Sequence, residues 1–210
     1  MVLVGILLLS GFALIAVEAI GYVRGGYGSE FWRLPLDDKL DHVAEHLSDW
    51  WWISIWSMIG IFTTTAGVAG LTALIANSGE PELAFVGLGG YLLAALAWVI
   101  GLSIQAAAIS SGASQRAETG ETPDWLRPLW NTAYVTEGLL ILGSNSAFVV
   151  MGAALLGTTL LPAWTGWAAI AIGLAIILLV VIRRDGFPQL AMIVPAILGV
   201  ALLIEAAAGT

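Results

Sequence analysis

The two histidines of the chain, His42 and His46, lie four residues apart, so both imidazoles can reach one ion if this segment is helical. Residues 42–46 also match the H-x-x-E-H pattern, in which two imidazoles hold zinc and the glutamate activates a water molecule. Two further carboxylates lie about one turn before and after the histidines. The candidate metal ligands are Asp38, His42, Glu45, His46 and Asp49.

Three interpretations of this cluster stay open. A five-residue motif is a weak signal, and no distant acidic ligand can be identified in the sequence. The simplest interpretation is a solvated acidic helix face whose histidines share no function. A structural metal site and a metallohydrolase are the alternatives. The sequence therefore predicts no cofactor, with a divalent metal such as zinc as the alternative.

Three glutamates lie inside long apolar stretches, where an ionisable group is costly and is a functional candidate by default. Glu18 and Glu205 lie near the ends of their stretches, so we expect their carboxyls to reach the membrane interface. Glu137 lies about two helical turns inside its stretch and is harder to explain in that way.

Glu137 shares a helix face with Tyr134, Ser144 and Asn145, although Ile141 interrupts the polar stripe. Further polar groups from other stretches, among them Ser103 and residues 63–65, are potential partners. Such a stripe either holds helices together by hydrogen bonds or lines a polar cavity in which Glu137 binds a proton or a cation. The candidate intramembrane ligand or proton site comprises Glu18, Gln105, Tyr134, Glu137, Ser144, Asn145 and Glu205.

Other catalytic signatures are missing from the sequence. The chain has no cysteine, no G-x-x-x-x-G-K-[ST] loop and no G-x-S-x-G elbow. Its only lysine, Lys39, lies outside the apolar stretches, which excludes a Schiff base within a membrane span. No enzyme activity is favoured.

The composition decides the fold class. Hydrophobic residues make up 59% of the 210 residues, and only 10% are charged, where a soluble domain carries roughly 25%. Disorder needs low hydrophobicity, a disulfide scaffold needs cysteine, and a nucleic-acid-binding domain needs a basic patch, whereas the net charge here is −8. The sequence predicts an all-α polytopic membrane protein with the lipid bilayer as its surroundings and no nucleic-acid partner.

We expect one transmembrane domain, residues 1–210, with six spanning helices. A span needs about 20 mostly apolar residues, and the apolar run from 128 to 182 is long enough for two. Its break falls at residues 157–162, because Pro162 suits a helix start. The expected spans lie near residues 2–23, 51–77, 84–108, 131–156, 162–182 and 189–208.

Every lysine and arginine falls in one of three connections, at residues 24–50, 109–130 and 183–188. The positive-inside rule makes those connections cytoplasmic and both termini external, in the plasma membrane. Residues 1–23 have no positive charge before the apolar run, so an uncleaved first helix is expected rather than a signal peptide.

The longest connection, residues 24–49, begins with glycines and then turns helical. Leu36, Leu40, Val43 and Leu47 recur at spacings of three and four, which predicts a cytoplasmic amphipathic helix at about 36–49 running into the second span. Its polar face is acidic and would be repelled by anionic lipid. We therefore expect it to pack on the protein's own cytoplasmic loops or on a protein partner.

The stretch 146–174 reads SAFVVMGAALLGTTLLPAWTGWAAIAIGL. Its small-residue helix, its Leu-Leu-Pro-x-Trp-x-Gly-Trp turn and its Gly-rich following helix resemble part of a bacterial family of small membrane proteins. Members of that family have six or seven helices and no assigned function. The resemblance covers about a seventh of the chain and implies no activity.

Three functional hypotheses follow. The first is a non-catalytic accessory or structural subunit of a membrane complex, which the many small residues in the spans and the acidic helix favour. The second is a small-molecule or proton-coupled transporter that uses Glu137 and Asn145. The third is a metal-dependent membrane enzyme that uses His42, Glu45 and His46.

Overall fold

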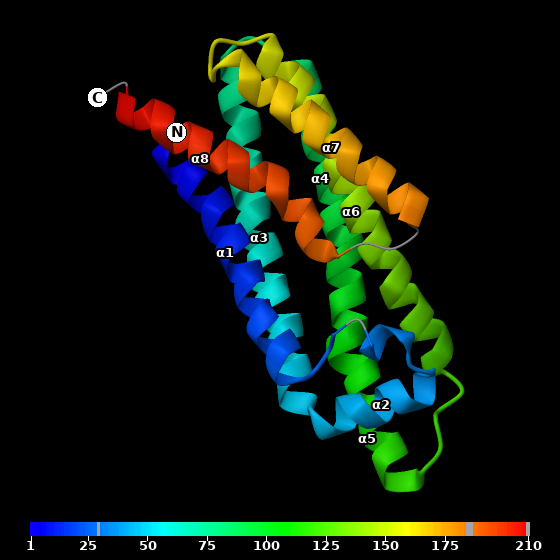
Figure 1. Ribbon diagram of the computed structural model, residues 1–210. Helices are drawn as coiled ribbons and strands as arrows, with labels where there is room; N and C mark the ends of the chain where they lie inside the picture. Colours follow the sequence, from blue (N-terminus) through cyan, green and yellow to red (C-terminus); the bar gives the residue numbers. More distant parts are fainter. Residues whose placement is uncertain (29, 184–186, 209–210) are drawn as a thin grey trace.

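The computed structural model describes residues 1–28, 30–183 and 187–208, and all regular structure within them is helical (Figure 1). In this part of the chain, six helical segments are long and apolar enough to cross a membrane, which confirms the expected number of candidate spans. They are α1 (Val2–Arg24), α3 (Leu47–Asn77), α4 (Pro81–Ser103) with η2 (Ile104–Ile109) and α5 (Ser110–Thr119), α6 (Leu126–Leu156), α7 (Ala163–Arg183), and η3 (Pro188–Met192) with α8 (Ile193–Ala208).

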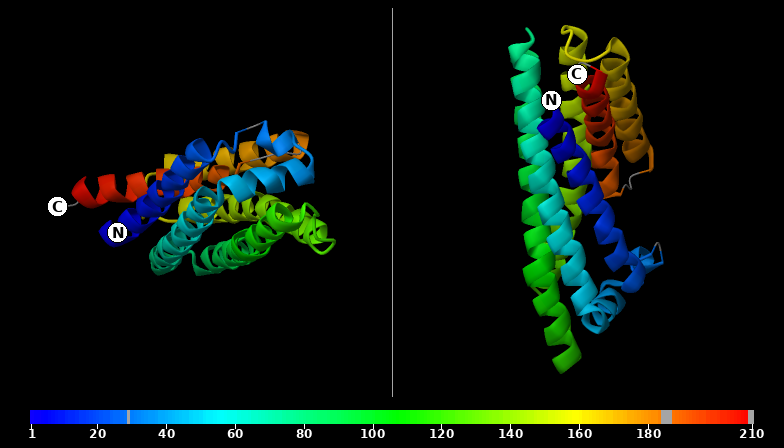
Figure 2. Two further views of the ribbon diagram at one scale, coloured as in Figure 1. Left: turned by 90° about the horizontal axis from the view of Figure 1, so that it is seen from below. Right: turned by 90° about the vertical axis from the view of Figure 1, so that its left-hand side faces the viewer.

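The helices form an elongated bundle in which α1 packs along α3, α4 along α6, and α6 along α7, while α8 packs against α1 (Figure 2). α1 begins and α8 ends at one end of the bundle (Figure 1). The short helices η1 (Phe31–Arg33) and α2 (Leu36–Glu45), together with α5, lie at the other end, which we call the α2 end. α7 and α8 do not extend as far toward the α2 end as α3 and α5 do (Figure 2).

Glycines allow α1 and α3 to approach closely. A Cβ atom on Gly11 would lie 2.0 Å from the Thr64 hydroxyl oxygen, and one on Gly60 would lie 2.4 Å from the Ile15 side chain. Both glycines are buried. Small residues of this kind drive helix association in lipid, where van der Waals packing replaces the hydrophobic effect.

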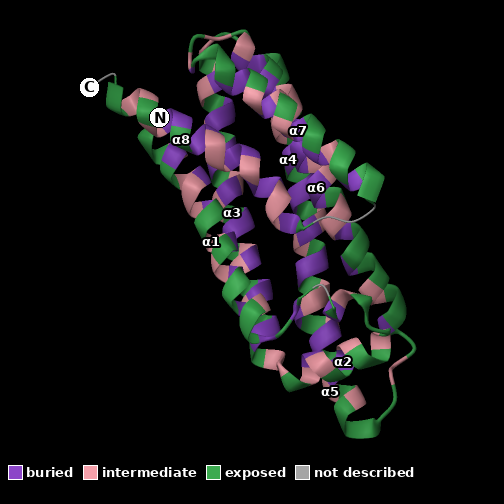
Figure 3. Ribbon diagram, in the orientation of Figure 1, coloured by how far each residue is buried: buried purple, intermediate pink, exposed green. Residues whose placement is uncertain are grey.

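Buried side chains line the faces between the helices, whereas many outward faces carry exposed apolar side chains (Figure 3). Phe62, Leu93 and Leu178, for example, are all at least 60% exposed, which suits contact with lipid tails. A second apolar cluster lies at the α2 end. It comprises Tyr27, Phe31, Leu40, Val43, Trp50, Ile53, Ile109, Ala113, Leu126 and Ala133.

The segment expected as one helix at 36–49 is broken at His46. The structure has α2 over Leu36–Glu45, a turn at His46 with φ −120° and ψ 35°, and α3 from Leu47. The break lets α2 lie across the end of the bundle while α3 runs along it (Figure 1). The His46 carbonyl then accepts hydrogen bonds from the backbone amides of Asp49 and Trp50 in the first turn of α3.

The acidic side of α2 packs on the chain's own helix α5. Arg116 of α5 binds Asp41 through two hydrogen bonds of 2.6 and 3.0 Å, and its Nη1 atom lies 3.7 Å from an Asp37 oxygen. The Thr122 hydroxyl donates to Asp37 at 2.7 Å. The Arg116 bond holds the pKa of the Asp41 carboxyl below its usual value. Of the two surroundings expected for this helix, the structure therefore shows contact with the protein's own α5.

Three spans extend further than the sequence predicted. The helices begin at Leu47 and Leu126 rather than near 51 and 131, and the segment expected at 84–108 continues to Thr119. The reason is the same in each case. The extra turns lie at the α2 end, where one side of each helix packs into the apolar cluster around α2, so apolar residues are not needed on every side.

A π-helical segment, η2, joins α4 to α5. There the Gln105 carbonyl accepts a hydrogen bond from the indole nitrogen of Trp50 at 2.9 Å. π-Helical turns change the hydrogen-bond register, so a carbonyl becomes free for another partner. The Gln105 carbonyl also lies 3.5 Å from the Ser110 hydroxyl, which donates to it. A contact between the Gln105 side chain and the polar stripe of α6 stays a prediction.

Candidate functional site

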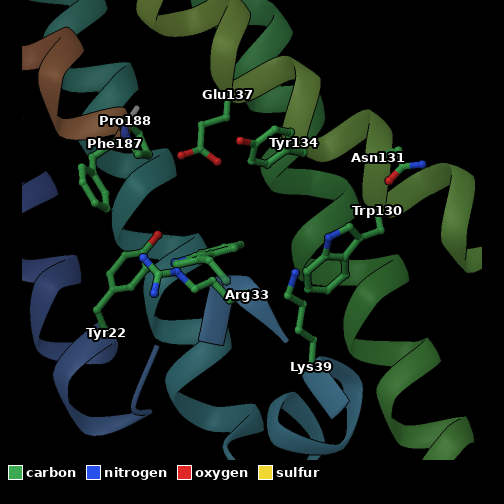
Figure 4. A pocket seen from close by; sticks show the side chains of 10 residues that line it. Tyr22, Arg33, Lys39, Trp130, Asn131, Tyr134, Glu137, Phe187 and Pro188 are labelled. Carbon is green, nitrogen blue, oxygen red and sulfur yellow. The ribbon is translucent and has the colours of Figure 1, made fainter. Parts of the chain in front are cut away.

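A cavity of about 390 Å³ lies at the α2 end, between the ends of the helices and the segment that carries η1 and α2 (Figure 4). This volume falls within the range of roughly 300–1,000 Å³ that is typical of small-molecule sites. Among the residues that the structure describes, three charged side chains line it, Arg33, Lys39 and Glu137. The remaining lining residues are mostly aromatic and comprise Tyr22, Trp32, Trp130, Asn131, Tyr134, Phe187 and Pro188.

Distant parts of the chain supply these side chains. Arg33 comes from η1, Lys39 from α2 and Tyr22 from the last turns of α1. Glu137 comes from α6, and its carboxyl points into the cavity from the side opposite Arg33 and Lys39 (Figure 4). Cationic groups and an acidic group thus face each other across one space.

Aromatic contacts fix the Lys39 side of the cavity. The Lys39 ammonium lies 5.6 Å from the centroid of the Trp130 ring, within the distance of a cation–π interaction. Trp130 stacks in turn on the buried ring of Trp50, with centroids 6.2 Å apart and planes 16° from parallel. Partial burial also lowers the pKa of Lys39, because removal from water disfavours its charged form. An anion in the cavity would offset that cost.

A buried carboxyl lies beside this cavity. Glu18 is fully buried, so the expectation that it reaches the interface is wrong. The Ser57 hydroxyl and the Gln189 side-chain amide both donate hydrogen bonds to it. These two donors satisfy a polar group that would otherwise be costly to bury. Glu18 and Glu137 also interact electrostatically with each other and with Tyr22, so the three groups form one polar region.

The polar stripe of α6 divides into two parts. Tyr134 and Glu137 line the cavity, as one of the two interpretations predicted. Ser144 and Asn145 are buried further along α6 and donate to the Ile141 carbonyl at 3.4 and 2.8 Å. Asn145 is therefore not part of the cavity, and its side-chain oxygen has no hydrogen-bond partner among the described residues.

Glu205 lies in the last turns of α8, at the end of the bundle opposite the cavity (Figure 1). It is half-buried, and its carboxyl forms no ion pair with a described residue. The structure does not bring Glu205 to the other candidate residues, and a position at the membrane interface stays a prediction.

The five metal-ligand candidates fall into a cluster of three residues and two residues outside it. His42, Glu45 and His46 come together, each with a potential ligand atom within 4.8 Å of the other two. Asp49 instead pairs with Arg24 at 3.2 Å, and Asp38 lies outside the cluster. The five-residue set expected from sequence is thus reduced to the three residues of the H-x-x-E-H string.

Sequence reasoning identified Tyr134 and Glu137 but missed most of the cavity. Trp130 is one turn before Tyr134 on the same face of α6, so the spacing could have extended the stripe toward the start of the helix. Arg33 and Lys39 gave no such signal. They lie in a segment whose position over the bundle depends on the turn at His46 and the contact with α5.

No protein-family model matches this sequence, and no curated protein or solved structure resembles it at a significant level. The resemblance of residues 146–174 to a bacterial membrane family stays a prediction.

Proposed function

We propose that this chain is a multi-pass protein of the plasma membrane that binds a small charged molecule in the cavity beneath α2, as a transporter or sensor of that molecule does. The cavity is the observation that carries this proposal. It combines a suitable volume with two cations, one carboxyl and several aromatic rings from the described part of the chain. This is the second of the three hypotheses, with Glu137 kept in the site and Asn145 outside it.

The lining favours a zwitterion. Arg33 and Lys39 suit an anionic group such as a phosphate or a carboxylate, because both are hydrogen-bond donors with a positive charge. Glu137 and the face of Tyr134 suit a cationic group. Since the two kinds of group face each other across the cavity, a molecule such as a phosphorylated amine would satisfy both sides (Figure 4).

The cavity favours ligand binding over a purely structural role. The argument for an accessory subunit depended on an acidic helix that docks on a partner. Asp37 and Asp41 of that helix already bind Arg116, which leaves less of the acidic face for another protein. Asp38 and Glu45 are exposed and are the residues through which such docking would occur.

The orientation is part of the proposal. The α2 end holds five of the described positive charges, Arg24, Arg33, Lys39, Arg116 and Arg127, and a sixth, Arg183, closes the end of α7 that is nearer to it. Positively charged loops favour the cytoplasmic side. We place α2 and the cavity in the cytoplasm and the start of α1 outside the cell. Because the chain has no cysteine, single cysteines introduced at Ser78 and Glu121 can be labelled with an impermeant maleimide in intact cells. Labelling of Ser78→Cys without Glu121→Cys is expected, and the reverse pattern contradicts this orientation.

The third hypothesis, a metal-dependent membrane enzyme, requires first that His42, Glu45 and His46 hold a divalent metal such as zinc. It also requires a substrate site beside them. The cavity beneath α2 is not lined by any of these three residues, so it does not supply that site.

Binding measurements test the proposed function. We would titrate O-phosphoethanolamine and inorganic phosphate into the purified protein in lipid nanodiscs and follow the heat released. Both probes should bind, and Arg33→Gln and Lys39→Gln should each weaken binding by about tenfold, which is the loss of roughly 1.4 kcal/mol expected for a charge-assisted hydrogen bond. Arg127→Gln is the matched control, because Arg127 lies at the same end but outside the cavity. Equal losses in all three variants would mean that general surface charge, not the cavity, attracts the probes.

A further inference from the structure

The cluster of His42, Glu45 and His46 lies where α2 ends and α3 begins. Both histidines are half-buried and Glu45 is exposed, so an ion can reach the three side chains from solvent. Their potential ligand atoms lie within 4.8 Å of one another. Ligand atoms about 2.0–2.2 Å from a tetrahedral zinc ion lie roughly 3.4 Å apart, so small side-chain rotations would close the site.

The His42 ring makes a backbone hydrogen bond of the kind that metal-bound histidines make. Its Nε2 atom lies 2.6 Å from the Gly25 carbonyl oxygen. A carbonyl can only accept, so Nε2 carries the proton and Nδ1 keeps the lone pair that a metal requires. Donation of the second ring nitrogen to a backbone carbonyl is the usual way in which proteins fix a ligand histidine.

Aromatic rings hold the same imidazole in place. The rings of Tyr27 and Phe31 pack against His42 with centroid distances of 5.3 and 5.4 Å. The Tyr27 hydroxyl donates to the His46 carbonyl at 3.2 Å, which fixes the turn between the two helices.

We propose that His42, Glu45 and His46 bind one divalent ion of the zinc type, with the fourth coordination position open to solvent. Two imidazoles and one carboxylate form a ligand set that zinc accepts, whereas calcium and magnesium prefer oxygen ligands alone. The ion would join the last turn of α2 to the first residue after it. It would thereby fix the angle at which α2 lies over the end of the bundle.

This site is independent of the cavity ligand, because none of its three residues lines the cavity. The chain is also well suited to a direct test. It contains only two histidines and no cysteine, so any binding of zinc through imidazole must involve this pair. The protein must therefore be purified with an affinity tag that contains no histidine.

The experiment is a titration of the chelator-treated full chain in detergent with Co²⁺, followed by competition with Zn²⁺. We expect one Co²⁺ per chain with the visible absorption of a four-coordinate site, displaced by one Zn²⁺, and a higher unfolding temperature in the presence of Zn²⁺. His46→Asn should abolish the absorption. Glu45→Gln, a change at an exposed position, should weaken zinc binding by about tenfold or more.

Asp38→Asn is the matched control, since it removes an exposed acid from the same helix outside the cluster. It should bind zinc as the original chain does. Three results would overturn the proposal. These are the lack of stoichiometric Co²⁺ or Zn²⁺ binding, binding that survives His46→Asn, and equal losses in Asp38→Asn and Glu45→Gln. Size-exclusion profiles of each variant separate loss of the site from loss of folding.

Discussion

The side-chain amide of Gln189 in η3 donates a hydrogen bond to the carboxyl of Glu18 in α1, although 171 residues separate them in the chain. The Ser57 hydroxyl of α3 donates to the same carboxyl. One buried side chain thus holds together three elements that are distant in sequence. Because Pro188, next to Gln189, lines the cavity, Glu18 also positions part of the cavity wall.

Replacement of Glu18 by alanine should destabilise the protein. The Ser57 hydroxyl and the Gln189 amide would lose their acceptor while they remain partly or fully buried, at a cost of about 1–3 kcal/mol for each unsatisfied group. Glu18→Gln keeps an acceptor oxygen of similar shape and should retain most of the stability. Thermal unfolding in detergent measures both variants, and a Glu18→Ala protein that unfolds at the original temperature would show that these hydrogen bonds contribute nothing.

A methyl group at Gly11 should separate α1 from α3. Its Cβ would lie 2.0 Å from the Thr64 hydroxyl oxygen, which itself donates to the Gly60 carbonyl. Overpacking of this kind costs about 1–3 kcal/mol. Gly89→Ala is the matched control, because a Cβ at Gly89 meets no atom within 4 Å. We expect a lower unfolding temperature for Gly11→Ala alone, and equal behaviour of the two variants would contradict the close helix contact.

Removal of the Arg116 guanidinium should loosen α2. Arg116 makes two hydrogen bonds to Asp41, but that carboxylate is 50% exposed, so screening by solvent should keep the loss of stability small. Global unfolding is a poor measure of such a local change. Hydrogen exchange of the α2 amides is the suitable readout. Arg116→Gln should speed exchange in α2 and leave α6 unchanged, whereas unchanged exchange in α2 would show that its apolar residues alone hold it in place.

The same contact should respond to acid. Arg116 lowers the pKa of Asp41 from the ordinary value of 3.8, mainly through its hydrogen bonds. The carboxylate therefore stabilises the native contact at and above pH 3.8, and that stabilisation is lost as the pH falls through the lowered native pKa. Exchange in α2 should stay constant from pH 7 to about pH 5, after correction for the intrinsic rate, and rise below about pH 3.8. If exchange in α2 rises equally in the original chain and in Arg116→Gln, the rise does not come from the contact between Arg116 and Asp41.

The six candidate spans could be predicted because apolar length alone decides which segments suit a bilayer. The same reasoning placed the ends of α3 and α6 too far inside the helices. Residues 47–50 and 126–130 look like interfacial chain in the sequence, but they continue the helices because α2 and α5 pack around them. Contacts between distant segments decide where these helices begin, and a local hydropathy pattern carries no information about such contacts.

The sequence predicted those parts of the candidate site whose residues are neighbours within one helix. His42, Glu45 and His46 come together because a single helical turn brings them together. Glu137 and Tyr134 were found for the same reason. Arg33 and Lys39 were not, since they approach Glu137 only after α2 folds over the bundle. Glu18 was misplaced because its partners, Ser57 and Gln189, lie on two other elements.

The central claim is that the cavity beneath α2 recognises both charges of a zwitterion. The most direct measurement is the ratio of the affinities for O-phosphoethanolamine and inorganic phosphate, by calorimetry in nanodiscs, in the original chain and in Glu137→Gln. We predict that the original chain prefers O-phosphoethanolamine by about tenfold, a difference of roughly 1.4 kcal/mol. Glu137→Gln should bind phosphate as before and lose that preference. Failure of the original chain to bind either probe, or a preference that survives in Glu137→Gln, would contradict the account.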